Sequence, residues 1–261
     1  KAVASGNNAM AYGTSVEASG LNSAALGNSN VSSGSSSFTA GTSNIAGGIS
    51  SVALGSENEI DSNANFSIVG GLSNLIKNSS YSAVVLGTSN EIDQSANAMA
   101  VGTENIIGSK ASANASIALG SLNSIDSDYS AAIGLENKIG QYSNYSFALG
   151  QNARIAGTAT DNASNTYNSY ALGYKATVGY DSVDGTTVKG ANSAYAIGSE
   201  ALANGKYSYA IGYRANAKAY GAIAIGTQSN INVATVESTV ASGINSIAIG
   251  SGIDVSKPYN T

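Results

Sequence analysis

The stretch Ser51-Val52-Ala53-Leu54-Gly55 alternates small and apolar residues and closes on a glycine. Close copies of it occupy residues 116–120, 146–150 and 246–250. Alternation with a period of two residues is typical of a β-strand, whose successive side chains point to opposite faces. We therefore expect each copy to form a short strand, and we call its closing residue the anchor glycine.

Fifteen anchor glycines occur along the chain. They are Gly13, Gly27, Gly41, Gly55, Gly71, Gly87, Gly102, Gly120, Gly134, Gly150, Gly173, Gly198, Gly212, Gly226 and Gly250. Several of the spacings between them are 14 residues, and no spacing is shorter. Helical repeats need about 33 or more residues per unit. The period predicts a parallel β-solenoid with a basic coil of 14 residues and tolerated insertions.

A second element follows most anchor glycines. After Gly55 come Asn58 at the third position and Ile60 at the fifth position, and equivalent positions elsewhere hold Asn or Ala and then Ile, Val or Ala. Each coil is therefore expected to contain two short strands separated by turns. We expect regular coils over about residues 9–255 of a single repetitive domain, 1–261.

The composition argues against an ordinary globular core. The chain of 261 residues has 3 Phe, 2 Met and no Trp, and only 10% of its residues are charged. Disordered chains combine low hydrophobicity with high net charge, whereas this chain is 43% hydrophobic with a net charge of −5. We expect a thin folded structure whose interior is too narrow for large side chains.

Residue types that are absent exclude several kinds of chemistry. The chain has no Cys and no His, so disulfides, thiolate metal sites and the commonest general base are excluded. We expect no cofactor, no bound metal and no enzymatic activity. The acidic balance disfavours nucleic acid as a partner, because phosphate binding needs clustered Lys and Arg. No run approaches the ~20 apolar residues of a membrane helix, and the opening residues Lys1–Gly6 do not have the pattern expected of a signal peptide.

The two faces of the first strand differ in size. In Ser51–Gly55 the small side chains suit the inside of a flattened coil, so the bulky ones should point outward and stack into an apolar ridge. An exposed ridge of this kind marks an interface, and closed symmetry is the usual arrangement of identical chains. The ridge is expected to be covered by copies of the same chain. Its predicted members are Val52, Leu54, Ile117, Leu119, Phe147, Leu149, Tyr195, Ile197, Ile211, Ile223, Ile225, Ile247 and Ile249.

Asparagine recurs at the third position after the anchor glycines before residue 150. Parallel stacking places identical side chains ~4.8 Å apart, a spacing at which amides form hydrogen-bonded ladders. We expect such a ladder, and recognition of a polar ligand by these amides is the alternative. At the sixth position stand Asp61, Lys77, Asp93 and Asp126. These charges indicate a surface ladder, with a hard cation such as Ca²⁺ as the alternative.

The whole pattern resembles the head repeats of YadA-like trimeric autotransporter adhesins, the type Vc secretion family. The shared motif is Ser/Ala-x-Ala-Ile/Leu-Gly followed by Ala or Asn three residues later, over residues 9–255. The resemblance implies a left-handed parallel β-roll, a homotrimer, and display on the bacterial cell surface. It also implies a signal peptide, a stalk and an outer-membrane anchor outside this chain. Gly70 departs from the motif, and no neck motif follows Gly250.

Three long insertions are the expected places for ligand binding, since loops carry function on a regular scaffold. They lie near residues 157–169, 179–192 and 233–242. Tyrosine concentrates in the second half of the chain and is enriched at binding hot spots. The candidate ligand-binding residues are Asp161, Tyr167, Tyr180, Asp181, Lys189, Tyr207, Tyr213 and Tyr220. The alternative is that the insertions only decorate the coils or clasp neighbouring chains.

The favoured function is adhesion of a bacterial head domain to the host. The resemblance implies collagen, fibronectin, laminin or a carcinoembryonic-antigen-related cell adhesion molecule as ligand. The alternative is autoagglutination or biofilm formation through contacts between heads. A solenoid enzyme would need paired carboxylates, and Asp126 and Asp128 are the nearest pair. We expect this pair to lie in a solvated turn without a catalytic role.

Overall fold

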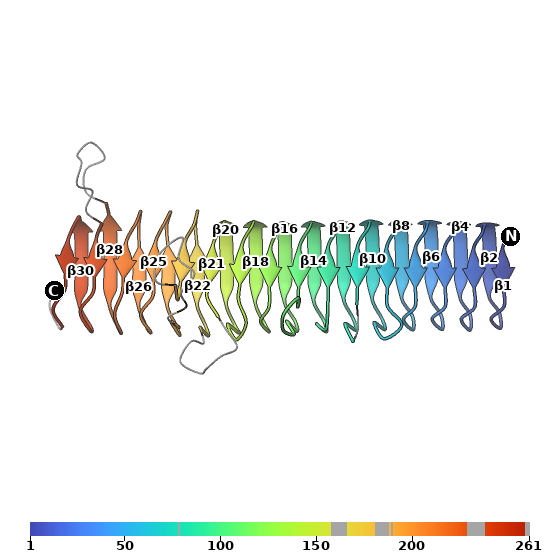
Figure 1. Ribbon diagram of the computed structural model, residues 1–261, viewed down its shortest axis with the longest axis horizontal. Helices are drawn as coiled ribbons and strands as arrows, with labels where there is room; N and C mark the ends of the chain where they lie inside the picture. Colours follow the sequence, from blue (N-terminus) through green and yellow to red (C-terminus); the bar gives the residue numbers. More distant parts are fainter. Residues whose placement is uncertain (78, 158–165, 181–187, 189, 229–237, 259–261) are drawn as a thin grey trace. The chain divides into compact units, whose positions relative to one another are not determined.

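A computed structural model describes residues 1–77, 79–157, 166–180, 188, 190–228 and 238–258. The described residues form short strands and turns and contain no helix. The chain divides into two compact units, Lys1–Asn123 and Ser124–Thr261. In each unit, coils follow one another in chain order (Figure 1).

Each coil contains an anchor strand, which leads to the anchor glycine, and a two-residue return strand. The anchor strands of the first unit are β2 (Met10–Thr14), β4 (Ala24–Asn28), β6 (Phe38–Thr42), β8 (Val52–Ser56), β10 (Ile68–Leu72), β12 (Val84–Thr88), β14 (Met99–Thr103) and β16 (Ile117–Ser121). Its return strands are β1 (Val3–Ala4), β3 (Glu17–Ala18), β5 (Val31–Ser32), β7 (Ile45–Ala46), β9 (Glu59–Ile60), β11 (Leu75–Ile76), β13 (Glu91–Ile92) and β15 (Ile106–Ile107).

The second unit repeats this arrangement. Its anchor strands are β18 (Ala131–Leu135), β20 (Phe147–Gln151), β22 (Tyr170–Leu172), β24 (Tyr195–Ile197), β26 (Tyr209–Ile211), β28 (Ile223–Thr227) and β30 (Ile247–Ser251). Its return strands are β17 (Ser124–Ile125), β19 (Lys138–Ile139), β21 (Arg154–Ile155), β23 (Thr177–Val178), β25 (Leu202–Ala203), β27 (Asn216–Ala217), β29 (Val240–Ala241) and β31 (Asp254–Val255).

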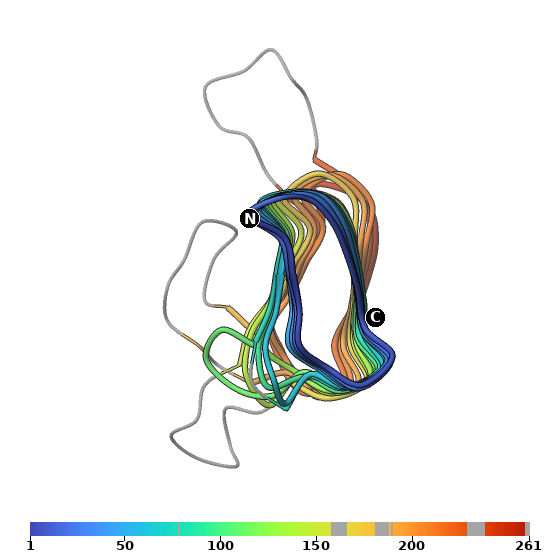
Figure 2. The same ribbon diagram turned by 90° about the vertical axis from the view of Figure 1, so that its right-hand side faces the viewer.

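Strands of the same kind pair in parallel and in register. Gly55 of β8 lies opposite Gly41 of β6 and Gly71 of β10, although the two chain spacings differ. Return strands pair in the same way, as β9 does with β11. Viewed end-on, the coils of each unit follow a common closed path (Figure 2). The predicted all-β parallel solenoid is confirmed.

The anchor position requires glycine. Gly71 has a φ of 119°, a conformation that L side chains rarely adopt, and a Cβ there would lie 1.9 Å from the carbonyl oxygen of Gly87. The next coil therefore approaches the backbone too closely for any side chain. This close approach explains why a glycine ends every copy of the motif.

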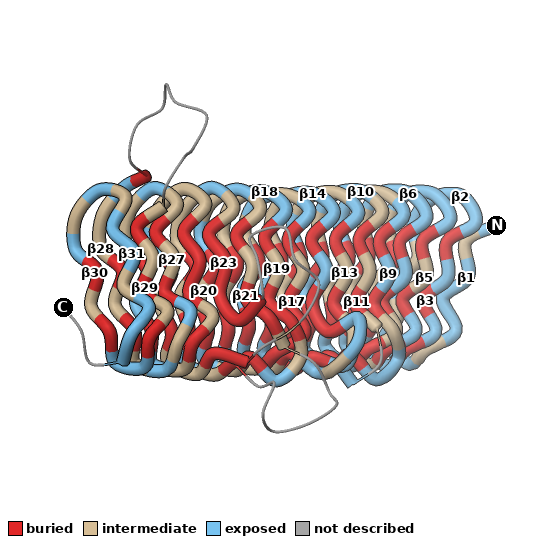
Figure 3. The backbone as a smooth tube through the Cα atoms, turned by 60° about the vertical axis from the view of Figure 1, so that its left-hand side comes forward, coloured by how far each residue is buried: buried red, intermediate tan, exposed pale blue. Residues whose placement is uncertain are grey.

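The strand alternation is oriented as predicted. Ser51 and Ala53 are fully buried, whereas Val52 and Leu54 keep part of their surface exposed. Buried and exposed residues alternate in this way along the anchor strands (Figure 3). The expectation of an interior without large side chains is wrong, because the return strands bury Ile60, Ile76 and Ile92 completely. The small residues of the anchor strands leave the room that these isoleucines fill.

The predicted asparagine ladder is present. The Nδ2 of Asn74 donates to the Oδ1 of Asn58 at 2.9 Å and to the Gly87 carbonyl at 2.7 Å. In the next coil the Nδ2 of Asn90 donates to the Oδ1 of Asn74 at 2.9 Å. The ladder thus joins each coil to the preceding amide and to the following anchor glycine, which satisfies polar groups that lie away from water.

Coils that have Ala in place of this Asn turn differently. The anchor strands β22, β24 and β26 have three residues each, and Ala176, Ala201 and Ala215 follow their glycines. In each case the alanine N–H donates to its own anchor glycine carbonyl at 3.4 Å. In these three coils the backbone closes a tighter turn and the strand ends earlier. Ala153 follows the five-residue strand β20 instead, and its N–H donates to the Oδ1 of Asn137 at 2.8 Å.

The regular coil resumes close to each predicted insertion. Ser169 and Ala191 are buried, and the Ser169 hydroxyl donates to the Ala191 carbonyl at 2.9 Å. Val240–Ala241 form β29, which pairs with β27 and β31. The end of the range 233–242 therefore belongs to a return strand. Thr239 occupies the position of the ladder asparagine, and its hydroxyl donates to the Gly250 carbonyl at 2.7 Å.

Two neighbouring glycines test the close approach of the coils. We expect Gly71→Ala to lower the free energy of unfolding by at least ~1–3 kcal/mol, because it combines a strained φ with a backbone clash. Gly70→Ala should stay within ~0.5 kcal/mol, because its Cβ would meet only the Leu86 Cδ2 at 3.1 Å. Urea unfolding followed by circular dichroism measures both. Equal stability of the two variants would contradict the proposed role of the anchor glycine.

Candidate functional site

The outward side chains of the anchor strands form an apolar ridge in each unit. All thirteen predicted members lie on the outer face of these strands, and none is buried. In the first unit Leu54 is 40% and Ile117 is 38% exposed, and in the second Ile249 is 62% exposed. Parallel pairing places equivalent members directly opposite each other, as with Ile223 and Ile247. The described residues of the single chain leave this apolar ridge uncovered.

Three tyrosines interrupt the aliphatic part of the ridge. Tyr195 stacks on Tyr170 with ring centroids 5.0 Å apart and on Tyr209 at 4.9 Å. Burial raises the pKa of the Tyr195 hydroxyl above its ordinary value, and the two neighbouring phenols raise it further. Since burial favours the neutral phenol, this stack behaves as part of an apolar surface. All three tyrosines stand three residues before an anchor glycine, as Val52 does, and so belong to the ridge.

The ladder asparagines cannot recognise a ligand. Asn58, Asn74 and Asn90 are at most 1% exposed. Their amides are already committed to the ladder and to the backbone. The alternative of polar ligand recognition along this row is therefore wrong.

Three of the charges at the sixth position, Asp61, Lys77 and Asp93, are partly exposed, whereas Asp126 is buried. Lys77 Nζ lies 2.9 Å from Glu91 Oε1, with both side chains about one-third exposed. The hydrogen bond from Lys77 to Glu91 raises the pKa of Lys77, and the charges of Glu91, Asp93 and Glu59 add to this effect. Exposed pairs of this kind contribute little to stability. Among the described residues no three acidic side chains gather as a metal ion would require.

The two carboxyl groups at 126 and 128 differ in exposure. Asp126 is 2% exposed, whereas Asp128 is partly exposed. The expectation of a solvated turn is therefore wrong for Asp126, which follows β17 directly and is buried.

Those predicted ligand-binding residues that the structure describes do not form one cluster. Asp161, Asp181 and Lys189 lie outside the described residues. Tyr167 is partly exposed at the turn before β22. Tyr180 is only 6% exposed, and the Arg154 guanidinium lies 4.5 Å above its ring. This burial leaves Tyr180 little surface to offer a ligand.

Tyr207 and Tyr220 are the candidates that the fold brings together. Their rings meet edge to face with centroids 5.4 Å apart, and they are 50% and 52% exposed. Both belong to turns that precede anchor strands. Tyr213 follows β26 at the other end of the strand and lies beside Arg214. Tyr207 and Tyr213 thus lie at opposite ends of β26, and Tyr220 lies before β28.

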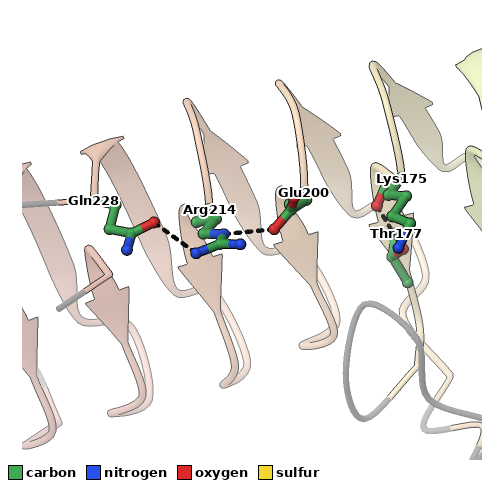
Figure 4. A network of polar contacts seen from close by, with 5 residues as sticks. All are labelled: Lys175, Thr177, Glu200, Arg214 and Gln228. Atoms are coloured by element: carbon green, nitrogen blue, oxygen red, sulfur yellow. Dashed lines mark hydrogen bonds and ion pairs between the residues drawn. The ribbon is translucent and has the colours of Figure 1, made fainter. Parts of the chain in front are cut away.

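A polar network that was not predicted lies near Tyr213. Arg214 donates through Nε to Glu200 Oε2 and through Nη1 to Gln228 Oε1, the latter at 3.0 Å (Figure 4). All three residues stand two positions after an anchor glycine. This shared position in the repeat is the sequence feature from which their proximity could have been predicted. A hollow of about 140 Å³ adjoins the network and is lined by Glu200, Leu202, Arg214, Asn216 and Ser238.

The YadA head domain repeat matches residues 203–229 and 237–252. The first copy spans β26, β27 and β28, and the second spans β29 and β30. The chain carries YadA head repeats. These YadA head repeats belong to a family of adhesin heads that are exposed at the cell surface and are not enzymes.

No curated protein matches the chain. In the described part of the chain, no helix has the length and apolar character needed to cross a membrane.

Proposed function

We propose that this chain is the head of a homotrimeric bacterial adhesin that attaches to host extracellular matrix or to an epithelial receptor. The observation that carries the proposal is the uncovered apolar ridge on a solenoid with YadA head repeats. Two further copies of the chain would cover the ridge and give three equivalent binding surfaces. Three surfaces produce avidity from modest single-site affinity. An anchor in the outer membrane, outside this chain, would hold the head at the cell surface.

Ligand contact is assigned to the Tyr207–Tyr220 pair, together with Tyr213 and Tyr167. Tyrosine offers a large contact area with a polar end. The two paired rings are half-exposed and stand outside the ridge. Collagen, fibronectin, laminin and carcinoembryonic-antigen-related cell adhesion molecules are the ligand classes to test. Autoagglutination is the second outcome to distinguish, since heads that associate with each other need no host ligand.

The role of the ridge is tested by two isoleucines of nearly equal exposure. Ile117 is 38% exposed on anchor strand β16, and Ile106 is 37% exposed on return strand β15. We expect Ile117→Lys to weaken trimer formation at least tenfold, because it places a charge in an apolar interface. Ile106→Lys should leave the trimer intact. Sedimentation equilibrium measures both, and a wild-type monomer, or equal loss in both variants, would contradict the assembly.

Adhesion is tested with immobilised ligands of the four classes. We expect Tyr207→Ala/Tyr220→Ala to lose at least tenfold in affinity, since exposed tyrosines at a contact are frequent hot spots. Tyr81→Ala is the control, because Tyr81 is 51% exposed at the equivalent turn of the first unit. Biolayer interferometry of the trimer gives the affinities. Clumping of coated beads without any ligand, and no binding to the four classes, would favour autoagglutination instead.

A further inference from the structure

Tyr129 and Tyr145 form an exposed aromatic pair at the turn before two successive anchor strands. Both stand five residues before an anchor glycine, with φ of 53° and 59°. The same position holds Asn8, Asn22 and Ser36 in other coils. A bulky residue is uncommon in this left-handed conformation. Nothing in the fold therefore requires tyrosine at this position.

The backbone holds the two rings in register. Ala131 lies opposite Phe147 in the β18–β20 pairing, and the Tyr145 N–H donates to the Asp128 carbonyl at 3.2 Å. The ring centroids are 5.0 Å apart and the ring planes differ by 2°. Equivalent atoms of the two phenols consequently face each other across one coil spacing.

The pair is accessible to reagents in solution. Tyr129 is 55% and Tyr145 is 56% exposed. The stack of Tyr170, Tyr195 and Tyr209 has the same spacing, but it belongs to the apolar ridge, and burial raises the pKa of its central member. The turn pair is thus the stacked pair that lies outside the ridge.

Tyrosine is the main target for one-electron oxidation in this chain. The chain has no Cys, no Trp and no His, but it has 15 Tyr. Without thiol, indole or imidazole groups, a one-electron oxidant acts mainly on the phenols. A radical formed on Tyr129 or Tyr145 has a second phenol in contact with it.

We propose that Tyr129 and Tyr145 are the site of an intrachain dityrosine cross-link. A haem peroxidase with hydrogen peroxide, as the oxidant, removes one electron and one proton from each phenol. The two phenoxyl radicals couple through their ortho ring carbons, and the hydrogen on each of these carbons moves to the phenolic oxygen. Peroxide is reduced to two water molecules, so the protein loses two hydrogen atoms in total.

The cross-link joins two neighbouring coils covalently. A solenoid unit contacts chiefly its neighbours, so separation of two coils can begin locally. A covalent bond across a 16-residue interval restricts the unfolded chain, as a disulfide does. The expected consequence is a higher Tm for the oxidised protein than for the untreated one.

The experiment treats the purified chain with haem peroxidase and hydrogen peroxide and then digests it with trypsin. Cleavage after Lys110, Lys138 and Arg154 places Tyr129 and Tyr145 on separate peptides, 111–138 and 139–154. Mass spectrometry should find these peptides joined, with the loss of two hydrogen atoms and with fragments that assign Tyr145 rather than Tyr142. The joined product should run as a single chain on a denaturing gel.

Matched variants decide the assignment. Tyr145→Phe keeps an aromatic ring in the turn, as Phe66 shows at the equivalent position with a φ of 59°, and it should abolish the joined peptides and the rise in Tm. Tyr81→Phe removes another exposed phenol and should change neither. The proposal is overturned if the wild type yields no joined peptides, if Tyr145→Phe yields them equally, or if the product is a covalent dimer.

Discussion

In the coils that carry a ladder asparagine, the structure depends on the corner where this side chain donates to the carbonyl of the following anchor glycine. Asn74 makes this bond to Gly87 at 2.7 Å and also contacts the amide of the preceding coil. These two bonds join three coils at a point where a Cβ on Gly71 would clash with the backbone. Strand register follows from this corner, because glycine must meet glycine. The alternation of buried and exposed side chains acts in the same direction, since a slip of one residue would turn the buried face outward.

Fixed register determines what each face of the solenoid can do. Each anchor strand has the same alternation relative to its anchor glycine. Small side chains therefore point inward and bulky ones outward. Isoleucines from the return strands complete the interior, so the outward side chains have no place within the chain. The exposed ridge is thus a consequence of the same corner that holds the coils together. Its coverage by other copies is the basis of the proposed adhesin head.

Local periodicity allowed the fold and the ridge to be predicted, because each signal lies within five residues, as in Ser51–Gly55. The buried Ile60 was not anticipated as a large interior residue, since the space it fills depends on the facing strand. The burial of Tyr180 depends on Arg154, 26 positions earlier, which no local pattern relates to it. Likewise, the contact of Arg214 with Glu200 and Gln228 requires knowledge of which coils stack. Sequence therefore indicated repeated features well and isolated contacts poorly.

The most direct test of this account is the unfolding free energy of Asn74→Ala against Asn28→Ala. Asn74 is 1% exposed within the ladder, whereas Asn28 is exposed at the end of β4. Removal of the buried amide leaves the Gly87 carbonyl without its donor, at a cost of ~1–3 kcal/mol, and Asn28→Ala should change stability by less than ~0.5 kcal/mol. That result in a urea titration would support the corner as the central constraint. Equal stability of the two variants would contradict it.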